Sequence, residues 1–372
     1  MTEQKKSERL LSLDALRGFD MLWIMGGALL IEGLARLTGW SFLEWFAGQQ
    51  EHADWHGFHF EDNIFPMFLF MAGVSMPFSI LKRQERGDSM KDIYFHLVKR
   101  TVILILLGMV YNGVQVFKPG HYRLASVLSR IALGSFFAAL IVLNSKKKWH
   151  YIWFAGILIF YWILSAFTSA PGFAMGDLTR EGCFAGYVDR LLIPWSMPWE
   201  NGMIEPEGIL STIPSVATGL LGVLTGHFLR TDYPEWSKLK KGIVMGVVGI
   251  SFVLLGYLWD MAFPINKKLW TSSFVVFAGG WSLIFFSIFY LIIDVWGYQK
   301  WAFFFIVIGA NSILSYLMQP VFNMWHIRDF FFGGILHHAP EAWAALLSGI
   351  TYVGTCWTFL YLCYKNKIFL KV

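Results

Sequence analysis

The chain has 372 residues, of which 56% are hydrophobic and only 15% charged, and its mean hydropathy is +0.52. A soluble domain of this size cannot bury so much apolar surface, whereas a lipid bilayer accommodates it. A net charge of +5 carried by so few ionisable residues argues against a nucleic-acid-binding surface. The three cysteines have no spacing typical of a metal site or a disulfide framework. The sequence therefore indicates an integral membrane protein whose main surroundings are lipid.

Ten segments are long and apolar enough to cross the hydrocarbon core, which takes about 20 residues. In chain order they are residues 15–37, 64–81, 98–117, 125–143, 151–168, 209–229, 242–261, 271–295, 302–321 and 342–364. The apolar stretch 330–336 is too short to cross and predicts a loop or a re-entrant segment. We therefore predict an all-α, polytopic helical bundle in which residues 1–372 form one membrane-embedded domain with one long loop, 169–208.

Lysine and arginine residues give the expected orientation, because cytoplasmic loops are enriched in them. With a cytoplasmic N-terminus, the basic clusters at 82–100, 146–148 and 230–241 all fall on the inner side. We therefore predict that both termini are cytoplasmic, in a multi-pass protein of the inner (plasma) membrane. The external face then carries the connections 38–63, 118–124, 169–208, 262–270 and 322–341.

The connection before the second expected span gathers histidines and carboxylates around a tryptophan, in the order His52, Trp55, His56, His59 and Asp62. An imidazole can act as a general base near neutral pH, and a carboxylate can orient it. An imidazole can also act as a nucleophile. Alternatively, these side chains anchor the chain at the membrane interface. Their spacing matches no standard zinc pattern, so we predict no metal site.

Two arginines lie at or within expected spans. Arg17 follows Asp14 by three residues, so the two share one helix face. They either orient the helix at the membrane edge or offer Arg17 to an anionic ligand. Arg130 falls in an apolar run, where a guanidinium needs a partner or a wet cavity. The group that pairs with Arg130 either stabilises the helical bundle or takes part in function.

Polar residues also gather before the sixth and eighth expected spans. Glu205 and Glu207 suit a helix N-terminus, where the helix dipole favours negative charge, or they bind the hydroxyl or amino groups of a sugar. Asn266 and Lys268 belong to a turn that precedes a helix start. Asn311 stands alone in an apolar span, where interhelical hydrogen bonding explains it.

Six of these segments, in this order, resemble the heparan-α-glucosaminide N-acetyltransferase family and its bacterial relatives. The segments are Leu13-Asp14-Ala-Leu-Arg17-Gly18; His52-Ala-Asp-Trp55-His56-Gly57 with Asp62-Asn-Ile-Phe65-Pro66; Val127-Leu128-Ser-Arg130-Ile131; Glu205-Pro206-Glu207-Gly208; Pro264-Ile-Asn266-Lys267-Lys268-Leu269-Trp270; and Gly309-Ala-Asn311-Ser312-Ile313-Leu314. Together they cover almost the whole membrane core. There are two departures. The eukaryotic asparagine late in the first core span has no counterpart in 23–28, and the eukaryotic Trp-Asn-Gly is here Trp55-His56-Gly57.

The resemblance implies a membrane-embedded acyltransferase that takes acetyl from cytoplasmic acetyl-CoA and places it on the amino group of a glucosamine-type sugar on the external side. The family's active-site histidine matches His52. Because the lumenal domain of the eukaryotic enzymes has no counterpart here, heparan itself need not be the acceptor. Direct attack of the amine and transfer through an acetylated His52 both fit the sequence.

On this hypothesis we assign roles to ten residues. His52 and Asp62 are the catalytic pair, and Arg17 and Arg130 bind acetyl-CoA. The residues expected to bind the acceptor sugar are Trp55, His56, Glu205, Glu207, Asn266 and Lys268. The alternative function is transport of a sugar or an organic anion, because polytopic bundles with buried Arg and Asn commonly transport. A homodimer is left open.

Overall fold

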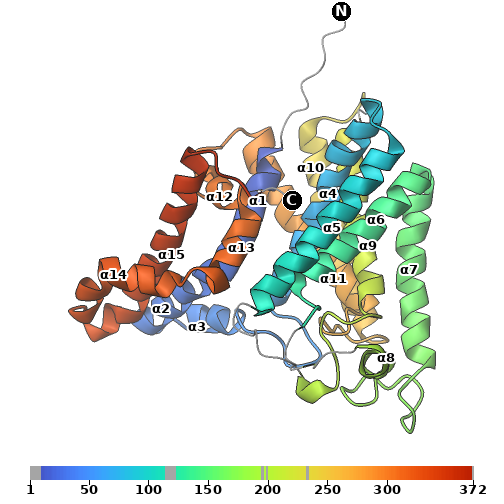
Figure 1. The fold of residues 1–372 in the computed structure, drawn as a ribbon, viewed down its shortest axis with the longest axis horizontal. Coiled ribbons are helices and arrows are strands. Elements are labelled where there is room, and N and C mark those ends of the chain that lie inside the picture. The colour runs from blue at the N-terminus through green and yellow to red at the C-terminus, as the bar shows by residue number, and fades with distance from the viewer. Residues whose placement is uncertain (1–9, 114–122, 194–196, 198–199, 232–233, 371–372) are drawn as a thin grey trace, which may run out of the picture.

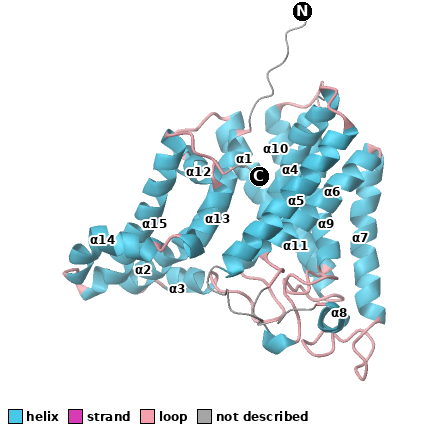
Figure 2. Ribbon diagram, viewed as in Figure 1, coloured by secondary structure: helices cyan, strands magenta, loops and turns pink. Residues whose placement is uncertain are grey.

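A computed structural model describes residues 10–113, 123–193, 197, 200–231 and 234–370. Within these residues the chain is entirely helical, without a strand (Figure 1 and Figure 2). Nine helical segments of this part are long and apolar enough to cross a membrane, and a bent pair brings the number to ten if it counts as one span. The predicted all-α polytopic bundle is confirmed, whereas its orientation in the membrane stays a prediction.

The nine segments correspond to nine of the ten predicted spans. The first is the continuous run of α1 (Leu11–Leu22), the π-helical turn η1 (Trp23–Gly27) and α2 (Ala28–Thr38). The others are α4 (Glu61–Glu85), α5 (Met90–Gly113), α6 (Val127–Asn144), α7 (Lys147–Phe167), α9 (Thr212–Arg230), α10 (Lys238–Asp260), α11 (Ser272–Phe289) with η3 (Tyr290–Val295), and α15 (Glu341–Lys365). The end of the third predicted span, 114–117, lies outside the described residues.

The ninth predicted span is not one straight helix. It is split into α12 (Ala302–Gly309) and α13 (Ser312–Val321), which are bent by 68° at the break. Asn311 occupies the break, is 2% exposed and has non-helical backbone angles. Its amide group bonds to backbone outside the helix, which offers the chain an alternative to helical hydrogen bonding there.

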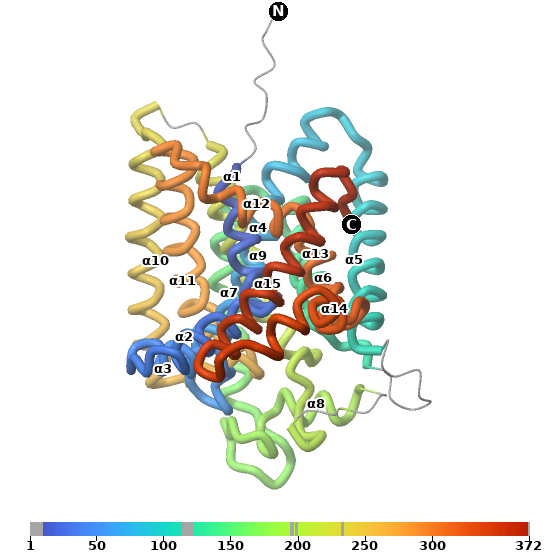
Figure 3. Tube along the Cα trace, turned by 90° about the vertical axis from the view of Figure 1, so that its left-hand side faces the viewer, coloured from blue at the N-terminus to red at the C-terminus, as the bar shows by residue number. Residues whose placement is uncertain are grey.

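Three short helices fill connections that were expected to be loops. They are α3 (Ser41–Gly48), α8 (Phe184–Leu192) and α14 (Met324–His337). The stretch 330–336 is therefore helical and not a loop, because it belongs to a longer helix that begins under an Asn323 cap; the alternative, a re-entrant segment, stays a prediction. With 14 residues α14 remains shorter than a span, and Figure 3 shows it lying across the bundle beside α15.

Small residues let the central helices approach backbone to backbone, as is typical of membrane bundles. A Cβ added at Gly73 of α4 would meet the Gly219 carbonyl oxygen of α9 at 2.1 Å. A Cβ added at Gly18 of α1 would meet backbone atoms of Phe305 in α12 at less than 3 Å. This packing holds α4 against α9 and α1 against α12.

The connections that carry the histidines, the long loop and the turn before α11 gather at one end of the bundle, below α5 and α11 in Figure 1. We call this end the histidine side. The opposite end, where α1 begins and α15 ends, we call the α1 side.

Candidate active site

A cavity of about 500 Å³ runs from the histidine side into the bundle. Its mouth is polar and its inner part is apolar. Among the residues predicted from sequence, the cavity lining includes His52, Trp55, Asp62, Glu207 and Lys268. Segments that are up to 216 positions apart in the sequence thus line one cavity.

His52, Asp62 and Lys267 form a triangle at the mouth. His52 Nδ1 lies 3.0 Å from Asp62 Oδ1 and 3.1 Å from Lys267 Nζ, and the lysine lies 3.3 Å from the same carboxylate oxygen. Asp62 is 1% exposed, whereas the His52 side chain is half exposed. Nδ1 of His52 therefore lies within reach of both a buried carboxylate and an ammonium group, and Nε2 points away from both and is available for chemistry.

The second oxygen of Asp62 fixes the histidine loop itself. Oδ2 accepts the backbone N–H groups of Ala53 at 3.1 Å and His59 at 3.0 Å. Asp62 also lies in the first turn of α4, where the helix dipole favours its charge. Gly57, at φ +116°, donates its N–H to the Ile265 carbonyl at 2.8 Å, which ties this loop to the turn before α11. A side chain would strain the backbone at that φ.

The turn before α11 places Lys267 at the mouth. Asn266 Oδ1 accepts the Leu269 N–H at 2.8 Å, and Thr271 caps α11 by accepting the Phe274 N–H. Trp270 has φ +53°, a conformation that bulky residues rarely adopt and that costs of order 1–3 kcal/mol. Burial lowers the pKa of Lys267, and the negative charges of Asp62 and Glu61 oppose that shift.

His56 and Asn266 contact each other and do not line the cavity. Asn266 Nδ2 lies 3.4 Å from His56 Nδ1, and burial lowers the pKa of this imidazole below its ordinary value. A neutral His56 that supports the Asn266 turn is the arrangement that the contacts favour. Because neither His56 nor Asn266 lines the cavity, their predicted role in binding the acceptor requires the acceptor to extend beyond the cavity lining.

Trp55 is held over the mouth by cations. The Arg180 guanidinium lies 4.9 Å from the ring centroid and the Lys268 ammonium lies 5.9 Å from it, while the indole N–H donates to the Leu178 carbonyl at 2.9 Å. Lys268 also donates to the Asp54 carbonyl at 2.7 Å and pairs with Glu200. The long loop thereby closes one side of the mouth.

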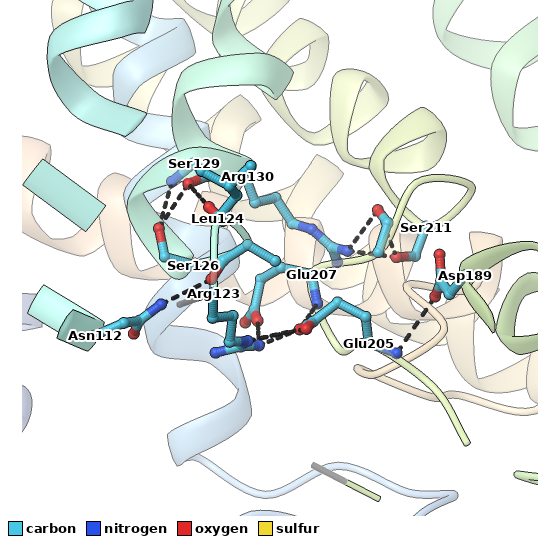
Figure 4. A network of polar contacts seen from close by, with 12 residues as sticks. Asn112, Arg123, Leu124, Ser126, Ser129, Arg130, Asp189, Glu205, Glu207 and Ser211 are labelled. Carbon is cyan, nitrogen blue, oxygen red and sulfur yellow. Dashed lines mark hydrogen bonds and ion pairs between the residues drawn. The ribbon is translucent and has the colours of Figure 1, made fainter. Parts of the chain in front are cut away.

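Arg123 organises the acids on the other side (Figure 4). Its Nε donates to Glu205 at 2.9 and 3.1 Å, and its Nη2 pairs with both Glu205 and Glu207. Glu205 is fully buried and does not line the cavity, whereas Glu207 does. Of the two predicted carboxylates, Glu207 is therefore the one that can contact a ligand.

Arg130 lies in the same polar network and not beside Arg17 (Figure 4). It is 1% exposed, its Nη2 donates to Ser211 and to the Gly208 carbonyl, and its guanidinium stands 4.9 Å over the Trp270 ring. Nearby, Asp189 accepts the Ile209 N–H at 2.9 Å and the Glu205 N–H at 3.4 Å. Burial raises the pKa of Asp189 to about 6. Arg130 thus compensates buried acids on the histidine side.

The inner cavity is lined by apolar side chains of four spans and by two tyrosines. The rings of Tyr111 on α5 and Tyr316 on α13 stack at 4.1 Å with an interplanar angle of 18°. The apolar members are Met21, Ile24, Phe65, Phe68, Leu128, Ile131 and Ile313. This part suits a slender, mostly apolar group and not a free sugar.

Arg17 lies on the α1 side, with its guanidinium 3.5 Å from Asp14. Arg100 of α5 is close enough to Arg17 for their positive charges to interact, and its Nε has no hydrogen-bond partner among the described residues. Two guanidinium groups from separate helices thus approach each other on the side opposite His52.

Sequence reasoning left Lys267, Arg123 and the tyrosine pair out of the assigned site. Lys267 directly precedes Lys268 in one of the segments that resemble the family, so that segment could have identified it. Arg123 precedes the sixth-span acids by about 80 residues and only the fold pairs them. Tyr111 and Tyr316 lie in apolar runs that carry no local signal.

The chain is similar in sequence to a family of unknown function and to curated acetyltransferases. Residues 9–118 match a family described as "Domain of unknown function (DUF5009)". Heparan-alpha-glucosaminide N-acetyltransferase of Mus musculus is 25% identical over an alignment that covers 100% of this chain and 62% of the mouse protein. The chain is related at family level to the heparan-alpha-glucosaminide N-acetyltransferases. The Homo sapiens enzyme of that name is also 25% identical, over 98% of this chain and 60% of its own length.

The alignment with the mouse enzyme extends over the whole chain. The chain spans about 60% of the length of these curated relatives. The resemblance recognised in the sequence is confirmed at the level of the family.

Proposed function

We propose that this protein is a transmembrane N-acetyltransferase, which moves acetyl from acetyl-CoA on the α1 side to the amino group of a glucosamine-type sugar on the histidine side. The observation that carries the proposal is the cavity: its polar mouth contains an Asp–His pair, and its apolar interior leads from that pair into the bundle. The names of the relatives supply the reaction class.

The chemistry needs a neutral amine, a base and stabilisation of an oxyanion. The amine nitrogen attacks the thioester carbonyl carbon, a C–N bond forms, the C–S bond breaks, and CoA leaves as the thiol. With Nδ1–H donated to Asp62, Nε2 of His52 is free to accept the amine proton and to return it to the leaving sulfur. Lys267 and Lys268 at the mouth provide positive charge for the oxyanion.

The alternative route, through an acetylated His52, uses the same geometry. Nε2 would attack the thioester first, and the sugar amine would then take the acetyl group from the imidazole. Asp62 would stabilise the positive charge of the acetyl-imidazolium in that intermediate. Both routes require Nε2 unprotonated, so both depend on Asp62 holding the proton on Nδ1.

The donor would bind with its nucleotide phosphates near Arg17 and Arg100 and its pantetheine arm along the apolar interior. Two arginines whose positive charges interact suit phosphate, which forms bidentate charge-assisted bonds with arginine. Lys241, another basic residue of the α1 side, is less suitable because its ammonium donates to the Leu229 and Thr231 carbonyls at the end of α9.

The acceptor would bind at the mouth, between Trp55 and Glu207. Trp55 and Glu207 both line the cavity, and an aromatic ring and a carboxylate are groups that contact the apolar face and the amino group of a hexosamine. An acetylation assay with a free sugar, an oligosaccharide and a cell-envelope glycan would identify the acceptor.

Transport remains the second candidate because of one feature, the break between α12 and α13. Discontinuous spans line the substrate sites of many transporters. In this protein, however, the polar group at the break, Asn311, bonds to the segment that follows α15. The Asp–His pair also has no evident role in a transporter.

The decisive experiment incubates the purified protein with acetyl-CoA, labelled in the acetyl group, and glucosamine. Formation of labelled N-acetylglucosamine, lost in His52→Ala, is the expected result. Uptake of glucosamine into vesicles without any acetylation would favour the transporter and overturn the proposal.

A further inference from the structure

The chain turns back into the bundle after α15. The last helical residues are followed by Lys367 at φ +58°, and the Ile368 N–H donates to the Cys363 carbonyl at 2.8 Å. This is a Schellman-type helix end, in which a left-handed residue reverses the chain, although glycine is the usual residue there. We call residues 366–370 the returning segment.

Asn311 holds the returning segment by its main chain. Its Nδ2 donates to the Ile368 carbonyl at 2.7 Å, and its Oδ1 accepts the Leu370 N–H at 2.9 Å. The buried amide at the α12–α13 break is thus bonded to two successive peptide groups, on either side of Phe369. Such a contact recognises amides and not side chains.

The contact lies against the inner end of the cavity. Asn311 directly precedes Ser312 and Ile313, which line the cavity together with Tyr316. Figure 1 and Figure 3 both show the C-terminal end of the chain beside α13 and α5. The returning segment is not itself part of the cavity lining, but its partner Asn311 adjoins the lining residues Ser312 and Ile313, beside the path proposed above for the pantetheine arm.

Pantetheine offers the same pattern of groups. Its β-alanine unit has an amide carbonyl on one side and an amide N–H on the other, as Phe369 has in the returning segment, with one additional methylene. A primary amide such as Asn311 donates to the first and accepts from the second.

We propose that Asn311 binds the pantetheine amides of the acetyl donor, and that the returning segment occupies this position until the donor displaces it. The inference rests on the proposed function. Besides the two Asn311 bonds, the segment makes a ring contact between Phe369 and Tyr364, while Ile368 and Leu370 are 58% and 39% exposed. Segments with so few buried contacts open at low free-energy cost.

The test measures CoA binding to the purified full chain by titration calorimetry. Truncation after Lys365 removes the competitor and should tighten CoA binding several-fold, because the free site becomes fully populated. Lys367→Pro should do the same without deletion, since proline cannot adopt φ +58°. Asn311→Ala should weaken CoA binding by about tenfold, which corresponds to about 1.4 kcal/mol.

The combination separates a binding residue from a simple latch. In the truncated chain, Asn311→Ala should still weaken CoA binding, and transfer from S-ethyl thioacetate, a thioester without an amide, should not change. Asn144→Ala, at an asparagine that bonds the Leu140 carbonyl and Tyr94, is the matched control.

If Asn311→Ala tightens CoA binding as truncation does, Asn311 is only a latch and the inference is wrong. If CoA binds equally to all variants, the inference is wrong and the proposed function stands. If CoA binds neither the intact nor the truncated chain, the proposed function fails as well.

Discussion

Replacing Asp62 by asparagine tests the Asp–His pair with little change of shape. The amide oxygen can still accept the two backbone N–H groups that Oδ2 accepts now, at 3.1 and 3.0 Å, so the histidine loop should keep its place. The amide nitrogen would then face His52 Nδ1 and Lys267 Nζ, where the carboxylate oxygen stood at 3.0 and 3.3 Å. The amide nitrogen, a hydrogen-bond donor, would thus replace the carboxylate oxygen, a charged hydrogen-bond acceptor.

The expected loss follows from those contacts. A hydrogen bond to a charged group contributes about 1.5–3 kcal/mol, and the wrong imidazole tautomer removes the lone pair from Nε2. A loss of about 3 kcal/mol in the transition state lowers kcat about a hundredfold. Asp62→Ala should in addition lower the melting temperature, because it also removes the acceptor of two backbone N–H groups.

Single-turnover acetylation of glucosamine and thermal unfolding in detergent measure the two effects separately. The reasoning is refuted if Asp62→Asn retains more than about a third of wild-type turnover, because a pair that orients the base cannot be so dispensable.

Further expectations follow from neighbouring residues. His52→Ala should lower turnover by about 10²–10⁴-fold while leaving CoA binding intact; if His56→Ala is the more damaging of the two in acetylation assays, the wrong imidazole has been chosen. Arg123→Met leaves a fully buried carboxylate unpaired and should destabilise the protein by about 3–5 kcal/mol, seen as a lower melting temperature; an unchanged value would contradict the buried ion pair. Because the pKa of Asp189 is raised from 3.8 to about 6, the folded state holds this proton more tightly, and stability should fall as the pH rises from about 4 to about 6. Asp189→Asn should make the unfolding temperature less dependent on pH over that range. An unaltered dependence on pH would count against the raised pKa.

The spans could be predicted from sequence because a bilayer imposes one length and one composition on every crossing helix. The break at Asn311 could not, since a single asparagine in an apolar run also fits a straight helix with an interhelical bond. Its cause lies some 57 residues further along the chain, where the returning segment supplies the bonded main-chain groups. Similarly, α14 escaped prediction because its apolar stretch is only part of a longer helix.

The functional site, like the fold, could be predicted from sequence only in part. His52 and Asp62 could be paired from sequence because ten residues separate them in one recognisable segment. Lys267 completes their triangle only through the fold, which brings the turn before α11 against the histidine loop by the Gly57–Ile265 hydrogen bond. The contacts of Arg130 with Ser211 and Gly208 also depend on the fold, while its role in binding the donor stays a prediction.

Acetyl transfer between the two sides of sealed, oriented vesicles tests the central claim most directly. Acetyl-CoA is supplied only on the α1 side, and a membrane-impermeant glucosamine oligosaccharide only on the histidine side. The account predicts acetylated oligosaccharide on the histidine side and free CoA on the α1 side, with neither product in vesicles that carry His52→Ala. Acetylation that occurs only when both substrates share one side would contradict transfer across the membrane.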